Sequence, residues 1–294
     1  MEEILSRYLD IDGPVHVADL GGEGEPIVCV HGLGGSYANW VPAAAGLGRL
    51  GAVSAIDLPG FGLTPPAGRS TTVEANRRIL DRYLRSLGKP VTLIGNSMGG
   101  AIAVRQASVA PETVSRLVLV SPAAPWDLLV EPPHPLVGAM FTAYAIPGLA
   151  GLVMWWRRAA MTPEDVAQWV LDLCAAHPER LPADVFDMHV RLAEQRRYLP
   201  GIDSAFVRAA RSVLYTTLRR SAYDREVAAV TAPTLVVHGE KDRLVPALAA
   251  RRLGALRPDW RVEILDEVGH IAMLEEVDAF VSLVDEFGRS SVAA

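Results

Sequence analysis

Ser97 is the residue whose surroundings most clearly indicate chemistry. It is the centre of Gly95-Asn96-Ser97-Met98-Gly99, a G-x-S-x-G pattern in which the serine stands on a strained turn with its hydroxyl above a sheet edge. A serine hydroxyl is a poor nucleophile at neutral pH, so it needs a base within hydrogen-bond reach and a third group that orients the base. The pattern therefore predicts nucleophilic catalysis if such partners exist elsewhere in the chain.

The residues around Ser97 predict the elements that would hold it. Residues 91–94 are mostly apolar and typical of a strand, and the alanine-rich run that follows Gly99 is typical of a helix. A Cβ atom at Gly95 or Gly99 would collide with the neighbouring strand or helix, which explains why both positions are glycine. We therefore expect a strand, a sharp turn at Ser97 and a helix.

Strands and helices alternate along much of the remaining chain. Two apolar runs at residues 15–20 and 26–30, separated by Gly21-Gly22-Glu23-Gly24, indicate a hairpin that leads into a buried strand. Residues 71–74 have the spacing of a capping box before a helix. Further strands are expected at residues 52–56, 116–120, 234–238 and 261–265. Parallel strands joined by helices bind ligands at their carboxyl ends, and Ser97 follows such an end.

Four motifs in a fixed order complete the pattern around Ser97. They are His31-Gly32-Leu33-Gly34-Gly35, Asp57-Leu58-Pro59-Gly60-Phe61-Gly62, the serine pattern, and the pair Gly239-Glu240-Lys241-Asp242 and Gly269-His270. With them the sequence resembles the α/β-hydrolase family over most of the chain apart from roughly residues 124–225. The order Ser, Asp, His is the chain order of that fold. The resemblance implies an α/β fold with a mostly parallel central sheet flanked by helices.

Residues 124–225, which lie outside the resemblance, are expected to form a second structural unit. Strand signals disappear there, and the composition becomes helical, interrupted by prolines and rich in large apolar residues. We expect residues 1–123 and 226–294 to form the α/β core and residues 124–225 to form an inserted helical cap.

The resemblance also implies roles for particular residues. His270 matches the catalytic base, and Asp242 matches the acid that orients it, although Glu240 is two residues away and chemically able. The backbone N–H groups of Leu33 and Met98 match the oxyanion hole. His31 is expected to be structural, and Asp57 is expected to brace its own loop.

Serine at position 97 favours acyl transfer. Family members that form alkyl-ester intermediates need a carboxylate there, because a seryl ether could not be hydrolysed. We expect hydrolysis of esters, or thioesters, of hydrophobic acids. One alternative is hydrolysis of carbon–carbon bonds, because the serine motif also resembles the meta-cleavage hydrolases of aromatic catabolism. That group usually has Gly-Pro-Gly where this chain has Leu33-Gly34-Gly35, and Trp where it has Ile271. A second alternative is a non-catalytic small-molecule-binding protein on the same fold.

Residues 136–156 form a run of 21 residues without a charge, long enough to span a bilayer as a helix. Glycines and Pro147 interrupt the run, and a span here would separate Ser97 from His270. We therefore expect two short cap helices hinged at Pro147-Gly148. Their large apolar side chains are predicted to form a substrate-binding wall above Ser97. The predicted wall consists of Phe141, Tyr144, Met154, Trp155 and Trp156.

Composition limits the possible partners. The chain has 294 residues and a net charge of −6, so nothing electrostatic favours nucleic acid or an anionic membrane. Its two cysteines do not make a disulfide framework, and its first residues lack the features of a signal peptide. We expect a cytoplasmic enzyme that acts on a small hydrophobic ester-type substrate, without cofactor, metal or stable membrane insertion. The oligomeric state is left open.

Overall fold

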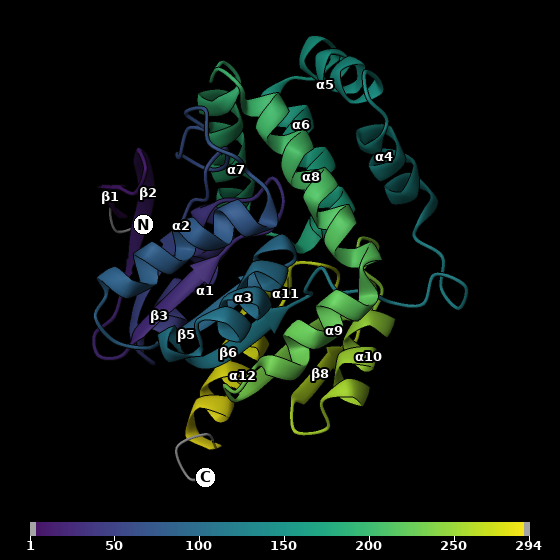
Figure 1. The fold of residues 1–294 in the computed structure, drawn as a ribbon. Coiled ribbons are helices and arrows are strands. Elements are labelled where there is room, and N and C mark those ends of the chain that lie inside the picture. Colours follow the sequence, from purple (N-terminus) through teal and green to yellow (C-terminus); the bar gives the residue numbers. More distant parts are fainter. Residues whose placement is uncertain (1–3, 291–294) are drawn as a thin grey trace.

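A computed structural model describes residues 4–290, so the outermost limits of the predicted core, 1–3 and 291–294, lie outside the described residues. Its strands form one sheet in the order β1-β2-β4-β3-β5-β6-β7-β8 (Figure 1). The strands are β1 (Leu5–Asp10), β2 (Pro14–Gly21), β3 (Pro26–Val30), β4 (Ala52–Ile56), β5 (Val91–Asn96), β6 (Val114–Val120), β7 (Thr234–Gly239) and β8 (Arg261–Leu265). Strands β3 to β8 are parallel, which confirms the expected fold class.

The predicted hairpin between residues 15–20 and 26–30 is wrong. Strand β2 pairs in antiparallel fashion with β1 and β4, whereas β3 lies between β4 and β5. All five residues of β3 are buried, as is typical of a central parallel strand covered on both faces. The hairpin partner of β2 is residues 5–10, whose mostly exposed side chains carry a weak strand signal.

Helices cover both faces of the sheet. Side chains alternate along β3, so that Val28 and Val30 join one buried cluster while Ile27 and Cys29 join the other. The first cluster is covered by α2 (Val73–Ser86), α3 (Met98–Val109), α9 (Arg220–Ala229) and α10 (Leu248–Leu256). The second is covered by α1 (Val41–Gly48), α11 (Ala272–Glu275) and α12 (Val277–Ser290).

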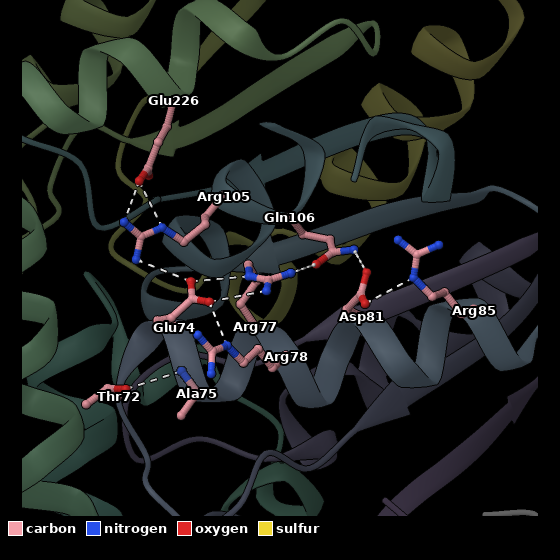
Figure 2. A network of polar contacts seen from close by, with 10 residues as sticks. All are labelled: Thr72, Glu74, Ala75, Arg77, Arg78, Asp81, Arg85, Arg105, Gln106 and Glu226. Carbon is pink, nitrogen blue, oxygen red and sulfur yellow. Dashed lines mark hydrogen bonds and ion pairs between the residues drawn. The ribbon is translucent and has the colours of Figure 1, made fainter. Parts of the chain in front are cut away.

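Polar contacts join α2, α3 and α9, as Figure 2 shows. The predicted capping box at residues 71–74 is wrong by one position, because Thr72 is the N-cap and its hydroxyl accepts from the N–H of Ala75. Glu74 instead binds the guanidinium groups of Arg77 and Arg78 on its own helix. Arg105 of α3 then donates to Glu226 of α9 at 2.8 Å.

Between β6 and α9 the chain is helical apart from its connections. The helices are α4 (Pro135–Ala145), α5 (Leu149–Ala160), α6 (Pro163–Cys174), α7 (Ala183–Arg196) and α8 (Ile202–Leu218). Helix α9 continues past residue 225 and packs on α3, so the predicted cap boundary falls inside a helix that contacts the core. The division into core and cap stays a prediction.

The predicted break at Pro147-Gly148 is confirmed, because α4 and α5 meet there with a bend of 116°. Figure 1 shows both helices at the outer edge of the molecule. Within residues 4–290, no single helix is long and apolar enough to cross a membrane, and only α4 and α5 taken together meet that criterion.

Candidate active site

Ser97 lies on the tight turn between β5 and α3. Its φ of +53° is strained for a residue with a side chain, and the expected steric reason for the flanking glycines is confirmed. A Cβ atom on Gly95 would lie 2.5 Å from the carbonyl oxygen of Gly99, and one on Gly99 would lie 2.3 Å from that of Val30. The Ser97 N–H donates to Val120, so the turn is tied to the next strand.

His270 and Asp242 are brought together by the loops after β8 and β7. His270 Nδ1 lies 2.7 Å from Asp242 Oδ2, and both side chains are buried. Since a carboxylate only accepts hydrogen bonds, Nδ1 carries the proton and Nε2 is left as an acceptor. His270 and Ser97 line the same cavity, although no hydrogen bond between their side chains occurs in the described part of the chain. Such contacts are often long before substrate binds.

The environment of Asp242 keeps its carboxyl group ionised. Burial alone would raise its pKa, but the charge of His270 and hydrogen bonds from His238 and His270 lower the pKa well below its ordinary value. The N–H groups of Leu244 and Val245 also donate to Oδ1, at 2.8 and 3.0 Å. Asp242 is therefore an anion held in one orientation beside an imidazole.

Glu240, the other acid considered for this role, lies elsewhere. Its side chain is exposed and forms an ion pair with Arg251 at 2.8 Å. His238 is fully buried, and its Nε2 lies 2.8 Å from the carbonyl oxygen of Val245 and 3.2 Å from Asp242. Only Asp242 therefore reaches His270.

Contacts to the backbone of His270 were not predicted from the sequence. Its carbonyl oxygen accepts from the side-chain amide of Asn96, at 3.1 Å, and its N–H donates to the carbonyl of Cys174 at the end of α6, at 2.7 Å. Glu275 accepts from the N–H groups of Gly269 and Ala176. The only sequence feature that could have indicated these contacts is the position of Asn96 directly before Ser97. The histidine loop is thus held by both the serine turn and the α4–α8 region.

The loop after β3 lies against the serine turn. A Cβ atom on Gly32 would lie 3.0 Å from Cβ of Ser97, so only glycine permits this approach. Within residues 4–290, the N–H groups of Leu33 and Met98 make no hydrogen bond, which leaves them free to bind an oxyanion.

Two further residues near this loop behave as the sequence predicts. His31 is structural, because its ring accepts the Leu58 N–H at 3.1 Å and lies 2.7 Å from the carbonyl oxygen of Gly32. Asp57 braces its loop by accepting from the N–H groups of Tyr37 and Leu63.

A cavity of about 790 Å³ extends from Ser97 and His270 into the α4–α8 region. Of the predicted wall, Phe141 and Tyr144 line it. The prediction is wrong for the other three: Met154 is buried between α4, α5 and α8, and Trp155 and Trp156 are exposed on the outer face of α5. Trp126 and Trp169 line the cavity instead.

Arg196, at the end of α7, is an additional cavity residue that the sequence did not single out. Its guanidinium donates to the carbonyl of Gly60 at 3.0 Å and stacks over the Phe61 ring. Its Nε is buried without a partner, and no acid in the described chain forms an ion pair with it. Burial lowers its pKa to about 10, so it remains a cation at neutral pH. The cavity thus contains an unpaired positive charge.

Comparison with known proteins places this geometry among hydrolases. The family model described as the alpha/beta hydrolase fold matches residues 25–277. A 2-hydroxy-6-oxononadienedioate/2-hydroxy-6-oxononatrienedioate hydrolase from Pseudomonas sp. is 28% identical over 294 residues, covering 96% of each chain.

Two further similar proteins carry different names. A dihydrolipoyllysine-residue acetyltransferase component of an acetoin cleaving system from Cupriavidus necator is 26% identical, over 95% of this chain and 67% of its own. The solved meta-cleavage product hydrolase of Pseudomonas fluorescens superposes with a TM-score of 0.73 at 24% identity, over 98% of both chains. At that identity the structural likeness supports the fold alone.

Proposed function

The chain belongs to the alpha/beta hydrolase fold family, and from that premise we propose that it hydrolyses a carbon–carbon bond beside a ketone in a substrate that also carries a carboxylate. The named hydrolases of 2-hydroxy-6-oxo dienoic acids support this choice, because they are similar over nearly the whole chain. In this proposal Ser97 is the nucleophile, His270 the general base and Asp242 the acid that orients it.

The observation that carries the proposal is Arg196, a cation that lines the cavity and forms no ion pair in the described chain. A partly buried guanidinium is best stabilised by an anion, and the Nε of Arg196 is buried without a partner although its other two nitrogens donate to the carbonyls of Gly34 and Gly60. A substrate carboxylate would provide the missing charge and acceptor in a charge-assisted pair. An ester of a plain hydrophobic acid would leave Arg196 unpaired.

The proposed chemistry uses the carboxylate end of the substrate as an electron sink. Once the 2-hydroxy dienoate has become its 2-oxo tautomer, Ser97 Oγ attacks the 6-ketone carbon and His270 Nε2 accepts the hydroxyl proton. The N–H groups of Leu33 and Met98 stabilise the oxyanion. The carbon–carbon bond then breaks, its electrons move along the chain to the 2-oxo group, and the released carbon chain takes up a proton. Water hydrolyses the acyl-serine, giving a carboxylic acid and the free serine.

Arg196→Gln tests the role of the cavity cation. With 2-hydroxy-6-oxo-2,4-heptadienoate as substrate we expect KM to rise about tenfold or more, since a hydrogen bond to a charged group contributes about 1.5–3 kcal/mol. Arg191→Gln is the matched control, because Arg191 is exposed on the same helix and does not line the cavity. Equal KM values for the two variants would contradict the assignment of Arg196.

Ester hydrolysis is the second candidate. It is favoured by Ile271 after the histidine and by Leu33-Gly34-Gly35 in the oxyanion loop, where this chain departs from the meta-cleavage hydrolases. The apolar residues along α4 would then contact the acyl chain. In that case Arg196→Gln should leave the KM for an uncharged nitrophenyl ester unchanged, and the dienoate should not be consumed.

A further inference from the structure

His238, near the end of β7, is a fully buried histidine that the proposed mechanism does not use. Its Nε2 lies 2.8 Å from the carbonyl oxygen of Val245 and 3.2 Å from Oδ2 of Asp242. Both of these oxygens accept hydrogen bonds, so Nε2 carries the proton of the ring. Nδ1 is buried without a partner, and a proton added there would have no acceptor. The ring is therefore a neutral donor directed at the catalytic acid.

The contact from His238 closes a ring of hydrogen bonds around Asp242. Oδ1 accepts the N–H groups of Leu244 and Val245, at 2.8 and 3.0 Å. Oδ2 lies 2.7 Å from Nδ1 of His270 and 3.2 Å from Nε2 of His238. Val245 thus donates to one carboxylate oxygen and accepts from the histidine that reaches the other. One imidazole therefore ties the strand end to the loop and to the carboxylate.

The other titratable groups around the carboxylate are engaged elsewhere. They are Cys174, Glu275 and Arg243. Burial raises the pKa of Cys174 to about 12, so its thiol is uncharged at neutral pH. Glu275 accepts from backbone N–H groups, and Arg243 donates to a backbone carbonyl. Within residues 4–290, His238 and His270 are therefore the only side chains that hydrogen-bond to Asp242.

We propose that His238 is a positioning residue of the triad, which holds Asp242 beside His270 and takes up part of the acceptor strength of its carboxylate. A carboxylate that accepts from a second imidazole binds the first less strongly. His270 is then available as a neutral base at lower pH. This inference rests on the triad of the proposed function, but it holds for either bond, because ester and carbon–carbon hydrolysis both use His270 as the base.

Two features separate this role from packing alone. Nε2 of His238 reaches a charged oxygen as well as a neutral carbonyl, and hydrogen bonds to charged groups are the stronger ones. His238 also does not line the cavity, so it reaches the substrate only through Asp242 and His270. A change at His238 should therefore alter kcat and its pH dependence more than KM.

The test compares two substitutions of His238 with one at another buried histidine. His238→Phe keeps an aromatic ring and removes the donor, whereas the longer amide of His238→Gln supplies an N–H close to the position of Nε2. His16→Phe is the matched control, because His16 is also fully buried and lies 2.8 Å from a buried aspartate outside the triad, Asp57. Hydrolysis of nitrophenyl butyrate is followed from about pH 5 to 9 at the isosbestic wavelength of nitrophenol.

His238→Phe should lower kcat about tenfold or more, with KM within about threefold of wild type. The acid limb of its kcat/KM profile should move to higher pH by about half a unit or more, because His270 is then the only side chain that donates to Asp242. His238→Gln should restore most of kcat and the wild-type acid limb. His16→Phe should leave the acid limb in place, whatever its effect on stability.

Three results would overturn the proposal. They are an unmoved acid limb in His238→Phe, a glutamine variant no better than the phenylalanine variant, and an equal shift in His16→Phe. The midpoint of the limb does not depend on the fraction of folded enzyme, so a partly unfolded sample still gives an answer. If His238→Phe does not fold at all, His238→Asn replaces it, because the shorter amide does not reach Oδ2. The proposed triad would fail differently, since Ser97→Ala would then hydrolyse the same ester as fast as wild type.

Discussion

At the scale of single residues, the account depends on a buried carboxylate that orients an imidazole toward a serine. Asp242 accepts from His270 and from two backbone N–H groups, which fixes both the tautomer and the direction of the ring. The sequence pointed to Ser97, Asp242 and His270 because short glycine-containing motifs mark them. It did not reveal Arg196, because a helical arginine has no motif and its missing partner becomes visible only in three dimensions.

The first prediction concerns the serine and the histidine as one unit. Ser97→Ala and His270→Ala should each reduce kcat on the order of 10⁴-fold or more, and the double variant should be scarcely worse, because the two losses are not additive. Circular dichroism should show that the fold is intact. If Ser97→Ala keeps about a tenth of the activity, another residue is the nucleophile.

The second prediction separates the two acids after β7. Asp242→Asn should reduce kcat about 100-fold or more, because an amide favours the wrong imidazole tautomer and does not stabilise the imidazolium. Glu240→Gln should be close to wild type, since Glu240 only pairs with Arg251 at the surface. The reverse ranking in folded variants would move the acid role to Glu240.

The third prediction concerns stability and pH. The folded-state pKa of Asp242 lies below its ordinary 3.8, so its stabilising effect is complete above that value and is lost as pH falls toward the folded-state pKa. Urea unfolding of wild type and Asp242→Asn should give a constant difference in unfolding free energy from about pH 8 to 5 and a smaller one below about pH 4. A difference that stays constant down to pH 3 would contradict this linkage.

At the scale of elements, most strands and helices follow from the sequence, and the errors have local causes. The helix start at Thr72 was misassigned by one residue, because two consecutive threonines satisfy the same pattern. Trp155 and Trp156 were assigned to the cavity because α5 is apolar on both sides. Its periodicity therefore gives no indication of which side faces inward. The histidine loop is fixed by contacts between distant segments, which no local pattern encodes.

The fourth prediction tests how Glu275, the last residue of α11, joins that loop to the segment after α6. Glu275→Ala leaves the N–H groups of Gly269 and Ala176 without their acceptor, so we expect a loss of about 2 kcal/mol in unfolding free energy and a lower kcat. Glu276→Ala is the control, because Glu276 is exposed and its side chain makes no hydrogen bond or ion pair in the described part of the chain. Equal kcat values for the two variants would mean that Glu275 does not position His270.

At the scale of the whole molecule, the sheet brings the ends of β3, β5, β7 and β8 to one edge, and α4–α8 enclose a cavity there. The family and fold were predictable because their motifs follow the strand ends. The residues that line the cavity could not be predicted, because they come from helices whose packing is set by tertiary contacts. The choice between ester and carbon–carbon hydrolysis therefore depends on what Arg196 binds in a cavity that other charged residues also line.

The most direct test of the central claim is the turnover of a 2-hydroxy-6-oxo dienoate by the wild-type enzyme in H₂¹⁸O, with product analysis by mass spectrometry. We expect consumption of the dienoate, equal amounts of the carboxylic acid and the shortened 2-hydroxy dienoate, and ¹⁸O in the acid, with all three abolished in Ser97→Ala. Nitrophenyl butyrate measured with the same enzyme should give a lower kcat/KM. Rapid turnover of the ester with no consumption of the dienoate would contradict the proposed carbon–carbon hydrolysis and leave ester hydrolysis as the function.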